Sequence, residues 1–380
     1  MPRLVIHVVH RFAVGGLENG VVNLINGLPA ERWRHAVVAL TDVDPAFSRR
    51  LQRPDVPCLS LHKPPGQSLW QFPQLWHLFR ALRPAIVHTR NLAAAEFQVP
   101  AWAARVPGRV HSEHGRDIDD VDGTNRRHIL LRRLARPFIG HQIALSQDLQ
   151  QYLQQKVCVA PGRLSQIYNG VDATRFRPAS RRQPVDGSPF NAPEFWLLGT
   201  VGRMVPVKAQ MLLVESFIAA LQQQPALRSR ARLVLVGDGP LRAQASVRLS
   251  ESGLQELAWL PGERSDVPEV MRGLNCFVLP SLVEGVSNTI LEAMATGLPV
   301  VATDVGANAD LVVHGETGHI VPSGSVDGMA VAMAELASEP DRARAMGARG
   351  RARIEERFSL DAMMAAYDAV YRRVLGIHGE

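Results

Sequence analysis

The sequence predicts an α/β protein made of two Rossmann-like domains, each with a parallel sheet. The chain has 380 residues, which is long for one domain and ordinary for two. Short apolar runs rich in Val and Ile alternate with helical patterns, as they do in a parallel sheet with helices on both faces. A polar, Pro-rich passage at 177–194 interrupts this alternation, which then starts again. The pattern therefore predicts domains at 1–180 and 195–358.

Each predicted domain has its own set of strands. The first set is expected at 4–9, 35–40, 85–89, 109–114, 141–146 and 164–170, and the second at 196–203, 231–239, 257–262, 276–281, 299–303 and 318–322. Helices are expected at 20–28, 69–82 and 148–155, and over most of 338–375. Open sheets of this kind bind ligands at the carboxyl ends of their strands, so a ligand is expected in the cleft between two facing sheets.

Composition narrows the class of protein further. With 46% hydrophobic and 21% charged residues, the chain has the make-up of a soluble globular protein. No apolar run approaches the roughly 18 residues of a membrane-spanning helix. The three cysteines, Cys58, Cys158 and Cys276, are scattered, which favours a reducing cytoplasm.

Positive charge is concentrated in the first half of the chain. Residues 1–180 carry 23 Lys and Arg against 13 Asp and Glu, and residues 181–380 carry 19 against 23. Such asymmetry suggests that the first half meets an anionic partner. Nucleic acid is not favoured, because no base-reading motif accompanies the charge.

The basic segment 126–137 (RRHILLRRLARP) shows helical periodicity. One arc of that helix would hold Arg126, Arg132, Arg133 and Arg136, and the opposite arc Leu130, Leu131, Leu134 and Ala135. Two interpretations stay open. The helix could lie on an anionic membrane surface, which would make the protein peripheral at the inner face of the membrane. Alternatively, it is an ordinary surface helix whose apolar arc packs on the core.

Two carboxylates flank the start of one expected helix in the second domain. Glu284 follows the strand 276–281, and Glu292 lies about one turn inside the helix, with Ser287 or Asn288 as its cap. A helix start favours phosphate, and the carboxylates could accept hydrogen bonds from hydroxyl groups on either side of a diphosphate. A sugar nucleotide has this shape. From the spacing alone, two solvated glutamates remain an alternative.

Cations and glycines stand at two other strand ends. Arg203 and Lys208 come just past the strand 196–203, where they could bind a diphosphate and stabilise it as a leaving group. The alternative is a pair of solvated surface cations. Gly15 and Gly16, after the first strand, permit close approach of the backbone to an anion.

Taken together, these motifs resemble the retaining glycosyltransferases of family 4, which have the GT-B fold. The resemblance covers nearly the whole chain. Its marks are GGLE (15–18), YNGVDATRFRP (168–178), GRMVPVK (202–208), LVGDGP (235–240) and the Glu284–Glu292 pair within EGVSNTILEAMATGLPVVAT (284–303). HVVHRFAVGGLENGVVNLINGLP (7–29) and SEHGRD (112–117) are most similar to the subgroup that accompanies bacterial exopolysaccharide loci of the exosortase type.

The resemblance implies a function and a set of site residues. A hexose would pass from a nucleotide-diphosphate sugar to a glycan or polyprenyl-linked acceptor with retention of the α configuration. By this resemblance, Arg203 and Lys208 would bind the donor diphosphate, and the backbone N–H groups of Asn288 and Thr289 would contact its phosphates. Glu284 would accept hydrogen bonds from the donor sugar, and Glu292 would bind the ribose. Gly16 would lie near the donor phosphate or the acceptor, and His114 would lie beside the reacting sugar. The last helix, about 359–375, would pack back onto the first domain.

No metal and no cofactor besides the donor substrate are expected, because the histidines are scattered and cations at the site can replace a divalent ion. The family often has Gly after the lysine, where this chain has Ala209, a departure that concerns the local loop shape. Two other functions stay open. A non-hydrolysing sugar-nucleotide epimerase would turn over donor without acceptor. A non-catalytic nucleotide-sugar-binding protein would be favoured by loss of Glu284, Arg203 or Lys208, all of which are present.

Overall fold

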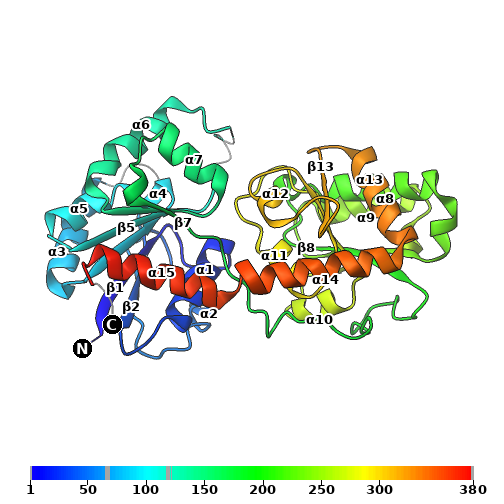
Figure 1. Ribbon diagram of the computed structural model, residues 1–380, viewed down its shortest axis with the longest axis horizontal. Helices are drawn as coiled ribbons and strands as arrows, with labels where there is room; N and C mark the ends of the chain where they lie inside the picture. The colour runs from blue at the N-terminus through cyan, green and yellow to red at the C-terminus, as the bar shows by residue number, and fades with distance from the viewer. Residues whose placement is uncertain (1, 65–68, 117–119, 121, 378–380) are drawn as a thin grey trace. The chain divides into compact units, whose positions relative to one another are not determined.

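The computed structural model describes residues 2–64, 69–116, 120 and 122–377 (Figure 1). The chain forms two compact units, Met1–Gly170 with Leu360–Glu380, and Val171–Ser359. Each unit contains one parallel sheet with helices around it, so the predicted α/β class with two Rossmann-like sheets is confirmed.

The first unit has a seven-stranded sheet in the order β3-β2-β1-β4-β5-β6-β7. The strands are β1 (Arg3–Val9), β2 (Trp33–Ala39), β3 (Cys58–Ser60), β4 (Ile86–Arg90), β5 (Gly108–Glu113), β6 (His141–Ala144) and β7 (Leu164–Gln166). From β1 the chain adds β2 and β3 on one side, and it then continues on the other side with β4. This reversal makes the carboxyl ends of β1 and β4 the switch point, where open sheets bind ligands.

Helices of the first unit cover both faces of this sheet. They are α1 (Gly16–Gly27), α2 (Pro45–Ser48), η1 (Leu69–Gln71), α3 (Phe72–Leu82), α4 (Leu92–Ala95), α5 (Gln98–Ala103), α6 (Arg126–Ala135), η3 (Arg136–Phe138), α7 (Gln147–Gln155), η4 (Pro161–Arg163) and α15 (Leu360–Val374). The last helix, α15, lies beside α1 (Figure 1). Asp368 ties α15 to the start of β2, because its carboxylate accepts a hydrogen bond from Trp33 Nε1 at 2.6 Å and pairs with Arg32 Nη1 at 2.5 Å.

The second unit has a six-stranded parallel sheet in the order β10-β9-β8-β11-β12-β13. The strands are β8 (Trp196–Val201), β9 (Ala231–Val236), β10 (Ala258–Gly262), β11 (Cys276–Leu279), β12 (Val300–Thr303) and β13 (Gly318–Val321). The helices are η5 (Pro206–Lys208), α8 (Gln210–Gln223), η6 (Pro225–Ser229), α9 (Leu241–Glu251), η7 (Gln255–Leu257), α10 (Val267–Arg272), α11 (Asn288–Ala295), α12 (Asn308–Leu311), α13 (Val326–Ser338) and α14 (Pro340–Arg357). Its switch point lies between β8 and β11.

Two glycines explain why the loop after β9 carries the sequence VGDGP. A Cβ on Gly237 would lie 1.9 Å from the carbonyl oxygen of Gly202, and one on Gly239 would lie 2.4 Å from that of Met204. Both glycines also have positive φ angles, 134° and 147°. Only glycine therefore allows the β9 loop to lie against the β8 loop, which carries Arg203.

The segment 126–137 forms the predicted helix α6, and Ala135 of its apolar arc packs with Ala95 and Ile139, but the expectation that the three leucines of that arc pack on the core is wrong. Leu130, Leu131 and Leu134 are 55%, 44% and 60% exposed, whereas Arg132 is only 5% exposed. Among the described residues, no helix is long and apolar enough to cross a bilayer.

A buried carboxylate explains this reversed orientation. Glu113, at the end of β5, is 1% exposed, and Arg132 faces it with Nε 2.7 Å from Oε1 and Nη2 3.3 Å from Oε2. An ionised carboxylate away from water requires a cation, and a bidentate arginine supplies it well. Turning Arg132 toward the sheet turns the leucines outward.

Candidate functional site

The switch point of the second unit holds an ion pair between two of the predicted site residues. Lys208 ends η5, in the loop after β8, and Glu284 lies in the loop after the neighbouring strand β11. Lys208 Nζ is 2.6 Å from Glu284 Oε1, and Ser281 Oγ donates to the same oxygen at 2.7 Å. Leu282 N donates to Val207 O at 2.9 Å, so the backbones of the two loops are joined as well.

Local packing holds Glu284 in place. Its side chain is 8% exposed and that of Lys208 is 27% exposed, so water screens the pair only in part. The loop after β12 is hydrogen-bonded to the loop that carries Glu284, since Ala307 N donates to Gly285 O at 2.9 Å. A Cβ on Gly306 would lie 2.2 Å from Glu284 O, so only glycine allows this approach. Sequence reasoning did not identify Gly306.

The helix α11 starts beside this pair. Ser287 is its N-cap, with Oγ accepting a hydrogen bond from Ile290 N at 3.3 Å, which decides between the two expected caps. Asn288 and Thr289 therefore form the first turn, where backbone N–H groups and the helix dipole favour an anion. Glu292 lies one turn further on and is half-buried.

Arg203 and Ala209 flank Lys208 in the β8 loop. The guanidinium of Arg203 is exposed and has no acidic partner among the residues that the structure describes, while its carbonyl oxygen accepts from Gln210 Nε2 at 2.8 Å. Ala209 has φ 48° and ψ 42°, the left-handed conformation. A residue with a Cβ adopts this conformation at a cost of about 1 kcal/mol, which gives a physical reason for the glycine that the family often has here.

The switch point of the first unit brings Gly15 close to Glu18, the last residue of the GGLE motif. Gly15 is the N-cap of α1, and a Cβ there would lie 2.1 Å from Glu18 Oε2, so the Glu18 carboxylate folds back over the loop. Burial raises the pKa of Glu18, while Arg90, at the end of β4, favours its charged form.

His114 follows β5 and is held from two sides. Its backbone N–H donates to Asn91 Oδ1 at 2.8 Å, and its Nε2 lies 2.8 Å from Ser112 Oγ. Burial, reinforced by the charge of Arg90, holds the pKa of His114 well below its usual range. The imidazole is therefore neutral at neutral pH.

Buried polar residues also lie on the strands next to His114, and the sequence contained a signal for them. His7, His88, Arg90 and His111 are buried residues of the strands β1, β4 and β5, which lie side by side in the sheet. A charged or imidazole side chain in such a strand needs hydrogen-bond partners from neighbouring strands, so its presence there points to a network.

The expectation of a metal-free site stays a prediction. The chain contains Asp-x-Asp triplets at 42–44, 117–119 and 120–122, a pattern able to bind a divalent ion. Asp44 caps α2 through Ala46 N at 2.8 Å, and Asp120 accepts from Asn125 N at 2.8 Å. Residues 117–119 lie outside the described part of the chain. Within that part, no group of three or more His, Cys, Asp or Glu side chains could hold a metal ion.

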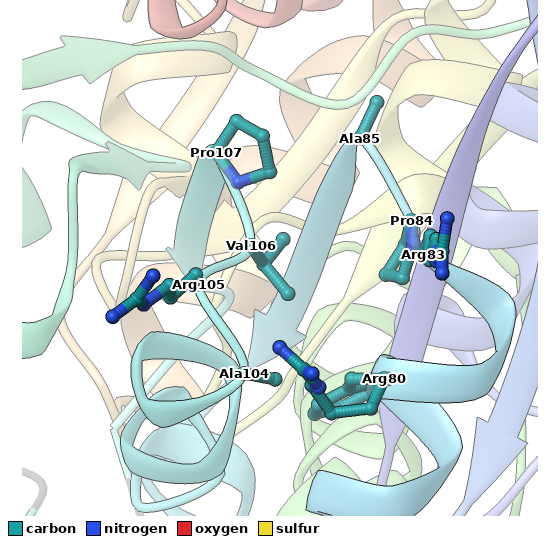
Figure 2. Close-up of a pocket in the computed structure, with 9 residues that line it drawn as sticks. Arg80, Arg83, Pro84, Ala85, Ala104, Arg105, Val106 and Pro107 are labelled. Carbon is teal, nitrogen blue, oxygen red and sulfur yellow. The ribbon is translucent and has the colours of Figure 1, made fainter.

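A separate hollow of about 500 Å³ lies near the amino ends of β4 and β5 (Figure 2). Figure 2 shows Arg80, Arg83 and Arg105 around it, with Val106 at its centre. It contains none of the predicted site residues, which lie at the opposite, carboxyl edges of the sheets.

Two Rossmann-like units with polar residues at their switch points are the architecture of the GT-B fold. Residues 14–175 match the model "Glycosyltransferase Family 4", and residues 196–339 match "Glycosyl transferases group 1". A D-inositol 3-phosphate glycosyltransferase of Thermobispora bispora is 31% identical over 328 residues, which are 82% of this chain and 68% of the relative. The chain belongs to glycosyltransferase family 4.

Other similar proteins agree with this assignment. The lipopolysaccharide core biosynthesis mannosyltransferase LpsB of Rhizobium meliloti is 33% identical over 216 residues, 55% of this chain and 60% of LpsB. The crystal structure of Anabaena HepE in complex with UDP superposes with a TM-score of 0.81 at 21% identity, covering 98% of this chain and 100% of HepE. The GT-B fold expected from the sequence is confirmed, while the narrower exosortase-type subgroup stays a prediction.

Proposed function

We propose that this protein is a retaining glycosyltransferase that moves a hexose from a nucleotide-diphosphate sugar to a glycan or lipid-linked acceptor, in the synthesis of exopolysaccharide or another cell-surface glycan. The observation that carries the proposal is the Lys208–Glu284 pair at the β8/β11 switch point. That pair lies in the part of the chain that matches glycosyl transferases group 1.

The residues around the Lys208–Glu284 pair match the groups of a nucleotide-diphosphate sugar: the diphosphate, the hexose and the ribose. Lys208 and Arg203 neutralise the diphosphate as it leaves, and the start of α11 binds its oxygens through Asn288 and Thr289. Glu284 accepts hydrogen bonds from the hexose hydroxyls, and Glu292 accepts them from the ribose. Solved structures of HepE contain UDP-glucose or UDP with glucose, and a Mycobacterium tuberculosis relative is named a GDP-mannose-dependent mannosyltransferase, so donors of both kinds are candidates.

The reaction needs no protein nucleophile. The bond between the anomeric carbon and the diphosphate oxygen breaks while the acceptor oxygen bonds to that carbon on the same face. The leaving phosphate oxygen takes the acceptor proton, and the cations Lys208 and Arg203 hold the charge that develops on the phosphate.

An acceptor-dependence assay tests this function. Nucleoside diphosphate release should require both a donor and a glycan or polyprenyl-linked acceptor, should persist in EDTA, and should yield an α-linked product by ¹H NMR. Epimerised donor formed without acceptor would identify an epimerase, and tight donor binding without turnover would identify a binding protein. A β-linked product would contradict retention.

Substitution of Glu284 and of Glu292 should have different effects on donor use and on nucleotide binding. Glu284→Gln should harm use of the donor sugar more than binding of free nucleoside diphosphate, because it removes an acceptor for hexose hydroxyls. Glu292→Gln should weaken nucleoside diphosphate binding more, because it removes one for the ribose; a lost charge-assisted hydrogen bond corresponds to roughly tenfold. Calorimetric titration of both variants with the nucleotide measures the difference, and equal weakening would contradict the assigned roles.

The outward face of α6 supports an acceptor at a membrane surface. Leu130, Leu131 and Leu134 are exposed, and Arg126 and Arg127 at the start of the same helix are exposed without a side-chain partner in the described part of the chain. Three other arginines of the segment serve the protein itself: Arg132 pairs with Glu113, Arg133 Nε donates to Lys156 O at 2.8 Å and Arg136 Nη1 to Cys158 O at 2.5 Å. An Escherichia coli relative, 27% identical, is named for a diphosphoundecaprenol-linked acceptor.

We therefore expect reversible binding to anionic vesicles through the leucine face. The triple variant Leu130→Ser, Leu131→Ser, Leu134→Ser should bind such vesicles at least tenfold more weakly, since burying one leucine is worth about 1.5–3 kcal/mol. Arg126→Gln with Arg127→Gln should remove most of the salt sensitivity, at about 1 kcal/mol per residue. Co-sedimentation at low and high salt is the measurement. The control is Val247→Ser, another exposed apolar residue, at 58% exposure. Vesicle binding that survives the triple variant would contradict a role for this face.

A further inference from the structure

A series of hydrogen-bonded, buried side chains in the first unit ends at His114. Ser112, on β5, pairs in register with Arg90 on β4, and its Oγ lies 2.8 Å from His114 Nε2 and 3.1 Å from His88 Nε2. On the far side of His88, the hydroxyl of Tyr371 lies 2.8 Å from Nδ1. Tyr371 belongs to α15, so the C-terminal helix reaches His114 through two intervening side chains.

Arg90 fixes the direction of these hydrogen bonds, because a guanidinium can only donate. Its Nη2 lies 3.1 Å from His7 Nδ1 and 3.3 Å from His88 Nδ1. Nδ1 of His88 must then be the unprotonated, accepting nitrogen, and the Tyr371 hydroxyl also donates to it.

The position of the His88 proton also determines the direction of the hydrogen bonds at Ser112. The only proton of neutral His88 is then on Nε2 and is donated to Ser112 Oγ. Among the described residues, the hydroxyl of Ser112 contacts only these two imidazoles, so Nε2 of His114 is the acceptor available to its proton. The proton of His114 is left on Nδ1.

The charge state of the cluster agrees with this assignment. Burial, with the added charge of Arg90, holds the pKa of His7, His88 and His114 well below the usual range, so each ring carries one proton at neutral pH. Nδ1 of His114 is shielded from solvent and has no hydrogen-bond partner among the described residues. A buried donor without a partner is unfavourable, and a ligand oxygen would satisfy it.

We propose that Tyr371, His88 and Ser112 are positioning residues that hold His114 as the neutral Nδ1–H tautomer, and that this N–H donates to an oxygen of the substrate that the first unit binds. The second clause rests on the proposed function, and the first does not. His114 is then neither a general base nor a general acid. Its Nε2 lone pair is engaged by Ser112, and no second proton is available on the ring.

The tautomer is tested without substrate. Long-range ¹H–¹⁵N spectra of protein labelled with ¹⁵N-histidine distinguish protonated from bare ring nitrogens, and His114→Gln assigns the signal. We expect a protonated Nδ1 and a bare Nε2 on His114, unchanged between about pH 6 and pH 8. A bare Nδ1, or a charged ring in that range, would overturn the assignment whether or not the protein transfers sugar.

Ser112 provides the kinetic test. Ser112→Ala removes the donor to Nε2, so His114 should populate both tautomers and kcat should fall about tenfold, with nucleoside diphosphate binding unchanged. Ser112→Thr keeps the hydroxyl and should restore both the Nδ1–H signal and kcat. A merely structural role would lower the melting temperature in Ser112→Ala without moving the tautomer. An unchanged kcat in a variant whose tautomer has shifted would overturn the role in positioning.

Discussion

Lys208→Ala should lower kcat/KM for sugar transfer by about a hundredfold, because a preorganised charge at a developing phosphate anion is worth roughly 3 kcal/mol in the transition state. The same substitution leaves the Glu284 carboxylate, 8% exposed, without its cation. Arg203→Ala should change the rate in the same direction, since its exposed guanidinium stands in the same loop. Steady-state kinetics with the preferred donor measures both effects.

Lys156→Ala is the matched control, because Lys156 is exposed and lies in the first unit. It should leave kcat/KM unchanged. The double variant Lys208→Ala, Glu284→Gln separates two explanations of a loss. The readout is binding of free nucleoside diphosphate, which Glu284→Gln alone should largely preserve. If the loss came only from an unpaired Glu284, the double variant would bind the nucleotide as tightly as Glu284→Gln does; loss of the Lys208 cation predicts weaker binding in the double variant. Near-normal rates for both Lys208→Ala and Arg203→Ala would show that the diphosphate binds elsewhere.

Arg132→Ala should destabilise the first unit by about 3–5 kcal/mol, because it removes one partner of a buried ion pair and leaves the carboxylate of Glu113 without a countercharge. For a unit of this size, the melting temperature should fall by roughly 10 °C. Arg133→Ala, the adjacent exposed arginine, should cost at most about 1 kcal/mol. Thermal unfolding followed by circular dichroism compares the two, and equal shifts would contradict the assigned orientation of α6.

The ion pair between Arg132 and Glu113 also makes the free energy of unfolding depend on pH. Burial alone would raise the pKa of Glu113, but Arg132 and His111 hold it at about 2, below the value of an unfolded chain. The ionised carboxylate therefore stabilises the folded state above the unfolded pKa of about 4.3, and this stabilisation is lost as the pH falls toward 2. Wild-type protein should lose stability over that range more steeply than Arg132→Ala.

The strand pattern could be predicted from the sequence because buried parallel strands are continuous apolar runs, and twelve of the observed strands coincide with such runs. The thirteenth, β3, was missed because Cys58–Ser60 is too short to stand out. The pairing of Lys208 with Glu284 was not readable from spacing. It depends on β8 lying next to β11, although β9 and β10 separate them along the chain.

The orientation of α6 shows where periodicity fails as a guide. The helix was predicted correctly, but periodicity presumes that the apolar arc faces inward. Glu113 comes from another element, and its need for a cation outweighs burial of three leucines. The His114 network was missed for a related reason, since its members come from β1, β4, β5 and α15. Its trace in the sequence is the histidines and the arginine at buried positions of β1, β4 and β5.

The proposed function requires that the second unit bind a nucleotide-diphosphate sugar at the β8/β11 switch point. Thermal shift with UDP, GDP, ADP and TDP tests it most directly, since a ligand of the native state raises the melting temperature. At a hundred times its Kd, the matching nucleotide contributes about 2.7 kcal/mol, or roughly 5–10 °C. The account predicts that at least one of the four gives such a shift, and that Lys208→Ala reduces the shift while Lys156→Ala does not. No shift with any of them, or a shift that Lys208→Ala leaves intact, would contradict it.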